Sequence, residues 1–525
     1  MFASSVPSLP PPNPLLDISS SASYLDPFAT PTLPPTSLTR MDSFTYSYYR
    51  SLHLSSLTSS TLNYLCCILS PAAAALPFVC ADLNPPVAFL CLSLCTFCAW
   101  FSSRILVLLA ATKSASTYEK LASLAFGRAA GLLVLFLQFN FSLLAVTLNI
   151  RQACSVLLVI MPSDFLSKSL PGLRMSDFPL SIIFMSLTTA PFLILFKTLP
   201  SISHLSFLSI LCFFFACCCI LFDFFVALPS GSGRRLEPLQ SSFADLTSPH
   251  PMSFASIGPL LYCFGSTFNS LNIYNTLRFR RPDRGLRVAN YSVLGAASLY
   301  LLFAAAGFAA YDDDSLSDDD AYFGGSSFSG MDVARYLYVL FCYFKSPFDI
   351  LMAKTLFLRL RRKVLSMPAF GAIRGNAANE NFFCFCCCCQ KSEASDAGQR
   401  QSSFGSECSS ARMSGSATPQ IKMGKSNLRG LISGLVWLAA VGLTLVPGIS
   451  GYIVFLGGPT ATFLGFAMPA LIYMKLRPVA QDFGDIALCG IVPNMIMASL
   501  VVALAVVAFV VACMSGVVKT TGGSS

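Results

Sequence analysis

Apolar runs of about twenty residues, separated by short polar loops, follow one another along most of the chain. As an α-helix, a run of this length crosses the hydrocarbon core of a bilayer, which is about 30 Å thick. A sliding window of that length predicts about eleven spans, at 62–80, 87–111, 131–160, 178–196, 203–227, 253–277, 288–310, 335–357, 429–447, 451–474 and 487–514. The predicted fold is an all-α polytopic membrane protein.

Two of these spans are interrupted at matching places in the two halves of the chain. Span 1 contains the break 71–77, and span 6 contains Gly258-Pro259 and then 264–267. Backbone in lipid must be hydrogen-bonded internally, so a break persists only where protein or a water-filled cavity receives the freed groups. Either break alone fits an ordinary kink, but the pair is typical of a transporter's binding site. We therefore expect a substrate site lined by Ser70, Ala72, Ala73, Ala74, Phe264, Gly265, Ser266 and Thr267.

Charges in the loops predict the orientation of the spans. Basic residues follow spans 2, 6, 8 and 10, whereas the Asp-rich loop 312–320 follows span 7; Arg234 and Arg235 after span 5 are the exception. The positive-inside rule places the basic loops and the N-terminus in the cytoplasm. The eleven spans divide into two groups of five and one extra span. Because each group has an odd number of spans, the second group starts from the opposite side of the membrane, and an inverted repeat is predicted.

This topology divides the chain into five predicted parts. They are a disordered cytoplasmic N-terminal tail at 1–60, a first repeat of spans 1–5 at 61–228, a second repeat of spans 6–10 at 252–359 and 428–476, a cytoplasmic Cys/Ser-rich loop at 360–427, and span 11 at 487–514. The tail is rich in Ser and Pro and has no apolar core, so it does not read as a signal peptide.

Composition agrees with the membrane assignment and excludes other classes. The chain is 54% hydrophobic and 11% charged, whereas a soluble domain carries about 25% charged residues. Its net charge of +9 does not indicate a nucleic-acid partner, because the basic residues lie in short loops between spans. The chain contains no P-loop, G-x-S-x-G or H-E-x-x-H motif and only 3 His, so we expect neither enzymatic activity nor a resident cofactor.

Four segments, in order along the chain, carry the pattern of a known family. They are Asn63, Ile68, Leu76 and Pro77 in span 1; Tyr118-Glu119-Lys120-Leu121 and Ala125-Phe126-Gly127-Arg128 ahead of span 3; Asn272-Ile273-Tyr274-Asn275-Thr276-Leu277 at the end of span 6; and Leu456-Gly457-Gly458-Pro459-Thr460-Ala461 with Pro469-Ala470-Leu471-Ile472-Tyr473 in span 10. Over about 60–514, the chain resembles the amino acid/auxin permease family of eukaryotic transmembrane amino acid transporters.

The resemblance implies secondary active transport of neutral or cationic amino acids by alternating access. The two breaks suit such a substrate, because its carboxylate matches a half-helix N-terminus and its ammonium matches unwound carbonyls. The chain departs from the family at Ser70, Pro71 and Ala72, where the family has glycines. The Cβ atoms there leave less room for a substrate backbone.

Span 8 places three polar residues inside the predicted bilayer, Lys345, Ser346 and Asp349. Lys345 and Asp349 are four residues apart and can pair on one helix face. In the family's sodium-coupled members a hydroxyl in span 8 helps to hold the ion, so the resemblance puts the Lys345 ammonium near that cation's position. Together with Asn63, these three are the predicted ion-coupling residues, for H+ or Na+. A purely structural ion pair, or a lysine that snorkels, is the alternative.

The predicted loop 360–427 contains a run of cysteines at Cys384, Cys386, Cys387, Cys388 and Cys389. Contiguous cysteines lack the spacing of a zinc site, and no His lies nearby. Reversible acylation next to the membrane is the favoured interpretation, and an unmodified loop is the alternative.

Several functional alternatives stay open at the level of sequence. An amino-acid-sensing receptor on a transporter fold would bind the same ligand without substantial flux, and a channel is a third possibility, against which the paired breaks argue. The sequence is compatible with the plasma membrane and with a vacuolar or endolysosomal membrane.

Overall fold

The computed structural model describes residues 55–160, 202–227, 257–278, 280–310, 329–365, 425–446, 449–476 and 495–522. All of them belong to the second of two compact units, His53–Ser525. Predicted span 4, the Asp-rich loop, residues 1–54 of the predicted tail and the cysteine run lie outside the described residues. The predicted tail boundary at residue 60 was wrong, because α2 already begins at Leu57.

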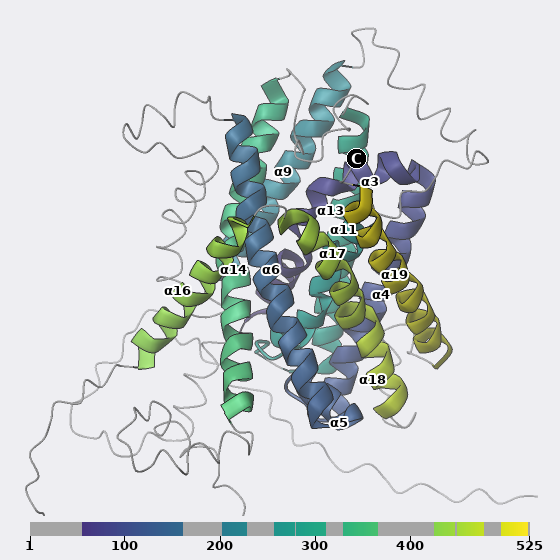
Figure 1. Ribbon diagram of the computed structural model, residues 1–525, viewed down its shortest axis with the longest axis vertical. Helices are drawn as coiled ribbons and strands as arrows, with labels where there is room; N and C mark the ends of the chain where they lie inside the picture. Colours follow the sequence, from purple (N-terminus) through teal and green to yellow (C-terminus); the bar gives the residue numbers. More distant parts are fainter. Residues whose placement is uncertain are drawn as a thin grey trace, which may run out of the picture. The chain divides into compact units, whose positions relative to one another are not determined.

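The described residues are almost entirely helical (Figure 1). The helices are α2 (Leu57–Ile68), α3 (Leu76–Leu83), α4 (Pro85–Thr112), α5 (Tyr118–Phe126), α6 (Arg128–Ile160), α9 (Ser203–Ala227), α11 (Ile257–Cys263), α12 (Ser270–Tyr274), α13 (Pro282–Ala310), α14 (Ser329–Leu365), α16 (Lys425–Thr444), α17 (Ile449–Thr462), α18 (Met468–Leu476) and α19 (Met495–Gly522). Five described segments are long and apolar enough to cross a membrane, or six if α2 and α3 form one bent span. The all-α polytopic fold is confirmed, whereas the number of eleven spans stays a prediction.

Apolar side chains are exposed on the outer helices, as expected of surfaces that face lipid rather than water. Phe222 and Phe225 on α9, Leu438 on α16 and Val507 on α19 each leave more than half of their surface uncovered. In water, a patch of this kind would be an aggregation hazard. In a bilayer it is the ordinary exterior of a spanning helix.

Span 1 breaks at Ser70 because of the residue that follows it. Pro71 disfavours the helical region for its predecessor, and Ser70 adopts extended backbone at φ −107° and ψ 145°. The Ser70 side chain then accepts a hydrogen bond from Ala72 N–H at 3.2 Å and caps the 3₁₀ turn η1 (Pro71–Ala75). The two halves of the span meet at an angle of 51°.

Span 6 breaks at Phe264, between α11 and the 3₁₀ turn η7 (Gly265–Asn269). This agrees with the predicted break at 264–267. Gly258 and Pro259 were also predicted to interrupt the span, and this was wrong, because both lie inside α11. A proline near the start of a helix removes an N–H that lacks an intrahelical partner anyway.

The two broken spans lie side by side and run in opposite directions. The first half of span 1, α2, contacts η7 and α12, whereas the first half of span 6, α11, contacts η1 and α3. Backbone hydrogen bonds join the start of span 1 to the end of span 6, from Ser55 N–H to the Thr276 carbonyl at 2.8 Å and from Arg278 N–H to the Ser55 carbonyl at 3.1 Å. These hydrogen bonds form a local parallel bridge between Ser55 and Leu277, whereas the two spans as a whole run antiparallel, as an inverted repeat requires.

Span 10 contains a third irregular turn beside the two breaks. The π-helix η11 (Phe463–Ala467) separates α17 from α18 and packs against η7. Such π turns occur often at functional sites. The long helices α6 and α14, which belong to spans 3 and 8, pack along each other (Figure 1).

Candidate functional site

One tyrosine hydroxyl ties the two breaks together. The fully buried Tyr300 on α13 accepts a hydrogen bond from Ser70 N–H at 2.8 Å. Its hydroxyl also lies 2.7 Å from the Ile68 carbonyl and 3.1 Å from the Cys263 carbonyl, so that its proton can be shared between them. One side chain thus reaches backbone groups freed in both spans, and leaving such buried groups unpaired is costly.

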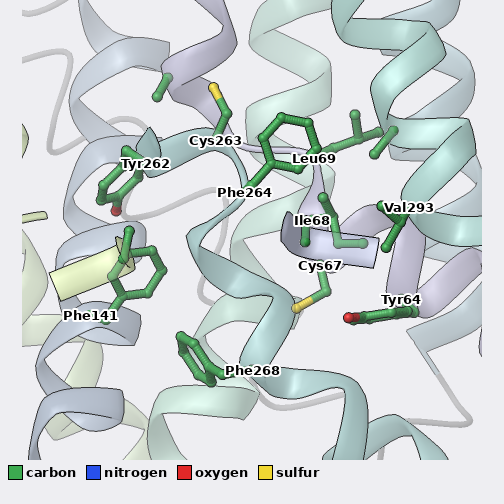
Figure 2. Packing of buried hydrophobic residues seen from close by; sticks show 14 of the residues in the cluster. Tyr64, Cys67, Ile68, Leu69, Phe141, Tyr262, Cys263, Phe264, Phe268 and Val293 are labelled. Atoms are coloured by element: carbon green, nitrogen blue, oxygen red, sulfur yellow. The ribbon is translucent and has the colours of Figure 1, made fainter. Parts of the chain in front are cut away.

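Two further tyrosines satisfy carbonyls at the breaks. Tyr338 on α14 donates to the Pro71 carbonyl at 2.6 Å, and Tyr64 on α2 donates to the Thr267 carbonyl at 2.9 Å. Figure 2 shows Tyr64 with its hydroxyl turned toward the span 6 ribbon. The breaks are therefore held by side chains from spans 1, 7 and 8, which we did not predict from the sequence.

Replacing Tyr300 with phenylalanine is expected to weaken this junction without changing the shape of the core. The variant leaves Ser70 N–H and at least one of two carbonyls without this partner, and each buried unsatisfied group costs about 1–3 kcal/mol. We expect a lower melting temperature in detergent and reduced uptake. Tyr291→Phe is the control, because Tyr291 lies on the same helix and is exposed. Equal effects of the two substitutions would contradict the role given to Tyr300.

The backbone of span 6 at Gly265 is enclosed by spans 3 and 10. A Cβ atom on Gly265 would lie 2.6 Å from the Ala461 Cβ atom of α17 and 2.6 Å from the Phe141 ring of α6. A Cβ atom on Gly465 in η11 would lie 3.1 Å from Thr267 Oγ1. At Gly265 the absence of a Cβ atom is what lets these side chains approach the backbone so closely.

The residues expected to line the site are all at or near the breaks, and most are buried. Ser70, Ala72, Ala73 and Ala74 are buried in span 1, as are Phe264, Gly265 and Thr267 in span 6, whereas Ser266 is partly buried. Their part in substrate binding stays a prediction.

Two hydroxyls beside the break of span 6 have no hydrogen-bond partner within the described ranges. They belong to Tyr262 on α11 and Thr267 on η7, which are 2% and 0% exposed. A buried hydroxyl without a partner is unfavourable by about 1–3 kcal/mol. A polar ligand at the break would relieve that cost.

The predicted pair in span 8 is formed and buried. Lys345 Nζ lies 3.0 Å from Asp349 Oδ1 and 2.9 Å from Oδ2, and the two residues are 2% and 6% exposed. Asn149 on α6 also donates to the Asp349 carboxylate. A buried carboxylate is tolerated when its charge is paired and its remaining lone pairs are hydrogen-bonded, and both conditions are met here.

The other predicted ion-coupling residues have different surroundings. Ser346 donates to the Cys342 carbonyl on its own helix at 2.8 Å, and Asn63 is fully buried in α2. Helix α14, which carries the pair, contacts α2, the first half of span 1.

A polar network near the C-terminal end of α14 was not predicted. Arg359 Nη1 donates to Asn272 Oδ1 at 3.1 Å and lies 3.8 Å from Glu119 Oε1 on α5. Asn272 donates to Asn269 Oδ1 at 3.0 Å, and Asn269 Nδ2 lies 3.4 Å from the Cys67 sulfur. The network therefore connects α5 and span 8 to both broken spans, on the side that the loop charges predict to be cytoplasmic.

Helix α5 is also fixed to the irregular turn of span 10. The Tyr118 hydroxyl donates to the Leu464 carbonyl at 2.9 Å. Burial raises the pKa of the Tyr118 phenol well above its usual value, so the group stays protonated and acts as a donor. The segment 118–128 and span 10, which both carry part of the family resemblance, are thus in contact.

Arg104, a charged residue inside span 2, has structural partners. Arg104 Nη1 on α4 lies 3.3 Å from Asn290 Oδ1 on α13, and its guanidinium lies 4.8 Å from the centre of the Trp100 ring. These contacts agree with a structural role. In the part of the chain that the structure describes, no group of three or more His, Cys, Asp or Glu side chains is arranged to hold a metal ion.

Comparison with protein families places this site in a known context. The family described as transmembrane amino acid transporter protein matches residues 53–512. The chain belongs to this family. The match covers both broken spans, span 8 and span 10, and it confirms the resemblance seen in the sequence. A search of curated proteins found no match.

Solved structures with a similar fold include those of a manganese transporter from Eremococcus coleocola. One mutant form has a TM-score of 0.51 at 12% identity, covering 93% of this chain and 90% of that chain. A complex with an aromatic bis-isothiourea substituted compound has a TM-score of 0.50 at 12% identity, covering 91% and 90%. At this identity the likeness shows the fold alone. Family and fold together identify a multi-pass membrane transporter, and they point away from an enzyme.

Proposed function

We propose that this family member is a secondary transporter that moves amino acids across a membrane by alternating access. The observation that carries the proposal is the antiparallel contact of two broken spans, with buried hydroxyls of Tyr262 and Thr267 that lack partners in the described ranges. A zwitterion would supply the carboxylate and ammonium that such breaks suit.

The substrate site lies at the breaks, between spans 1 and 6, with spans 3, 8 and 10 around it. The contacts of Tyr338 from α14, of Phe141 from α6 and of Ala461 from α17 with the breaks support this placement. Lys345, Asp349, Asn63 and Ser346 remain the proposed coupling residues, with H+ favoured over Na+, or with facilitated transport and no coupling ion.

The Arg359 network acts as a closed gate on the predicted cytoplasmic side. It joins the ends of spans 6 and 8 to α5 through Asn272 and Glu119. Alternating access requires each side to open in turn, so that these contacts would separate when the cytoplasmic path opens.

Uptake into proteoliposomes tests the proposed function. Purified protein is reconstituted, and each of the twenty labelled amino acids is supplied with and without an inward proton gradient, in sodium and in a sodium-free buffer. We expect saturable uptake of a subset of amino acids. Saturable binding in detergent without uptake would favour the amino-acid-sensing receptor instead, and neither binding nor uptake would contradict an amino acid substrate.

A further inference from the structure

Phe141 of span 3 contacts span 6 on both sides of its break. Its ring centre lies 4.9 Å from that of Tyr262, before the break, and 5.5 Å from that of Phe268, after it. Figure 2 shows the three rings grouped around the span 6 ribbon. Phe141 and Phe268 are 1% and 0% exposed, so the ring is fully enclosed.

The same ring covers the one position in the break that has no side chain. The Cζ and Cε2 atoms of Phe141 lie 2.6 and 2.8 Å from the place of a Cβ atom on Gly265. Ala461 covers that place from span 10 at 2.6 Å, also with a single methyl group. The place beside the Gly265 backbone is therefore filled by one large ring and one small side chain.

On the proposed function, with the substrate's carboxylate and ammonium held at the two breaks, we place its side chain beside the Gly265 backbone, against Phe141 and Ala461. Any atom added there must displace these neighbours, because even one carbon would lie 2.6 Å from each of them. A side chain of one or two heavy atoms therefore displaces the Phe141 ring less than a larger one does. A leucine or phenylalanine side chain requires the Phe141 ring to leave its contacts with Tyr262 and Phe268.

The polar groups around this space carry no net charge in the described part of the chain. Lys345 and Asp349 neutralise each other through two contacts at 3.0 and 2.9 Å. The hydroxyls of Tyr262 and Thr267 are neutral and lack partners in the described ranges. A charged substrate side chain would therefore be buried without a counter-charge, which is strongly unfavourable.

We propose that Phe141 selects substrates by size and restricts this transporter to small neutral amino acids, such as glycine, alanine and serine. The ring acts as a steric limit, because the helices that carry it and Gly265 are already in contact. Ala461 sets the opposite limit, and the two buried hydroxyls are available to hydrogen-bond the substrate.

The first test uses the wild-type protein in proteoliposomes and requires no substitution. Unlabelled glycine, alanine, serine, valine, leucine, phenylalanine, lysine and glutamate compete against labelled alanine, or against whichever amino acid is taken up. Small neutral amino acids should compete at least about 10-fold better than leucine, since each methylene that a pocket cannot place changes specificity by about 10–200-fold. Equal competition by leucine or phenylalanine would overturn the inference but leave amino acid transport standing.

The second test removes the ring. Phe141→Ala should raise the ratio of leucine to alanine uptake by about 10-fold or more, and Phe141→Leu should raise it less. The control is Phe139→Ala, on the same helix, because Phe139 pairs with Phe357 of α14 at 5.5 Å and not with span 6. An unchanged ratio in both Phe141 variants, or the same change in Phe139→Ala, would show that Phe141 does not select. Uptake of no amino acid by correctly inserted wild-type protein would overturn the proposed function, and this inference with it.

Discussion

Gly265→Val is expected to abolish uptake while the protein still reaches the membrane. The first added carbon would lie 2.6 Å from the Ala461 Cβ atom and 2.6 Å from the Phe141 ring. The ring is the far end of a rotatable side chain and can move aside. The Ala461 Cβ atom is fixed to the backbone of α17, so span 10 itself must shift or the break must change its shape.

We expect Gly265→Val to lose uptake because the steric strain falls on the proposed substrate site. Overpacking a tight interior costs about 1–3 kcal/mol, which a large helical protein can survive. At the break, however, the same shift displaces the backbone that we propose binds substrate, and it presses η7 against the contact it makes with η11. We expect initial rates of uptake at background level with surface amounts close to wild type.

Two further variants separate this clash from a general effect of valine in a membrane helix. Gly434→Val places the same side chain on α16, where a Cβ atom meets nothing within 4 Å, and it should retain uptake. Adding Ala461→Gly to Gly265→Ala removes one of the two close contacts and should restore part of the activity that Gly265→Ala alone loses. Normal uptake by Gly265→Val would remove the substrate site from the break of span 6.

The sequence was sufficient to predict most of the helices, because lipid imposes a simple rule on apolar length. The predicted span 203–227 has the bounds of α9, and the predicted span 87–111 lies within α4. The first break was also readable, since Pro71 acts on the residue just before it. The prediction of a break at Gly258 and Pro259 was wrong because the effect of a proline depends on its position in the helix. The sequence alone did not determine that position.

The side chains that form hydrogen bonds with the backbone at the breaks were not predictable from local sequence patterns. Tyr300 is about 230 positions from Ser70 in the chain, and no spacing rule connects them. A usable signal was nevertheless present, because a tyrosine in the middle of a span is expensive unless its hydroxyl finds a partner. Phe141 gave no such signal, since it is one of 46 Phe, and only the packing around Gly265 distinguishes it.

The Lys345–Asp349 pair, by contrast, was predicted from its spacing of four residues. We expect substitutions in this pair to have large effects. Single neutralisation, by Lys345→Ala or Asp349→Ala, should reduce both the amount of folded protein and uptake. Each leaves a buried charge without its partner, which costs about 3–5 kcal/mol. Quantitative membrane yield and melting temperature measure the first effect, and proteoliposome uptake measures the second.

Lys345 should also make transport by the wild-type protein insensitive to sodium. An ammonium and a sodium ion about 4 Å apart repel by about 4 kcal/mol at the effective dielectric constant of a partly solvated protein site. The two therefore do not share this place beside α2. Strong stimulation of uptake by sodium, at constant pH and membrane potential, would show that Lys345 does not take the position of a cation.

The double variant Lys345→Gln with Asp349→Asn decides whether the pair couples transport to protons or only supports the fold. It removes both charges together, keeps hydrogen-bonding side chains four residues apart on α14, and leaves an amide oxygen to accept from Asn149. We expect it to fold better than either single variant and to exchange amino acids across the membrane at equal concentrations. If the pair exchanges the coupling proton, the double variant should lose accumulation against a gradient, because neither of the substituted side chains titrates. Accumulation that stays driven by a proton gradient in the double variant would assign the pair a structural role and move the coupling site to other residues.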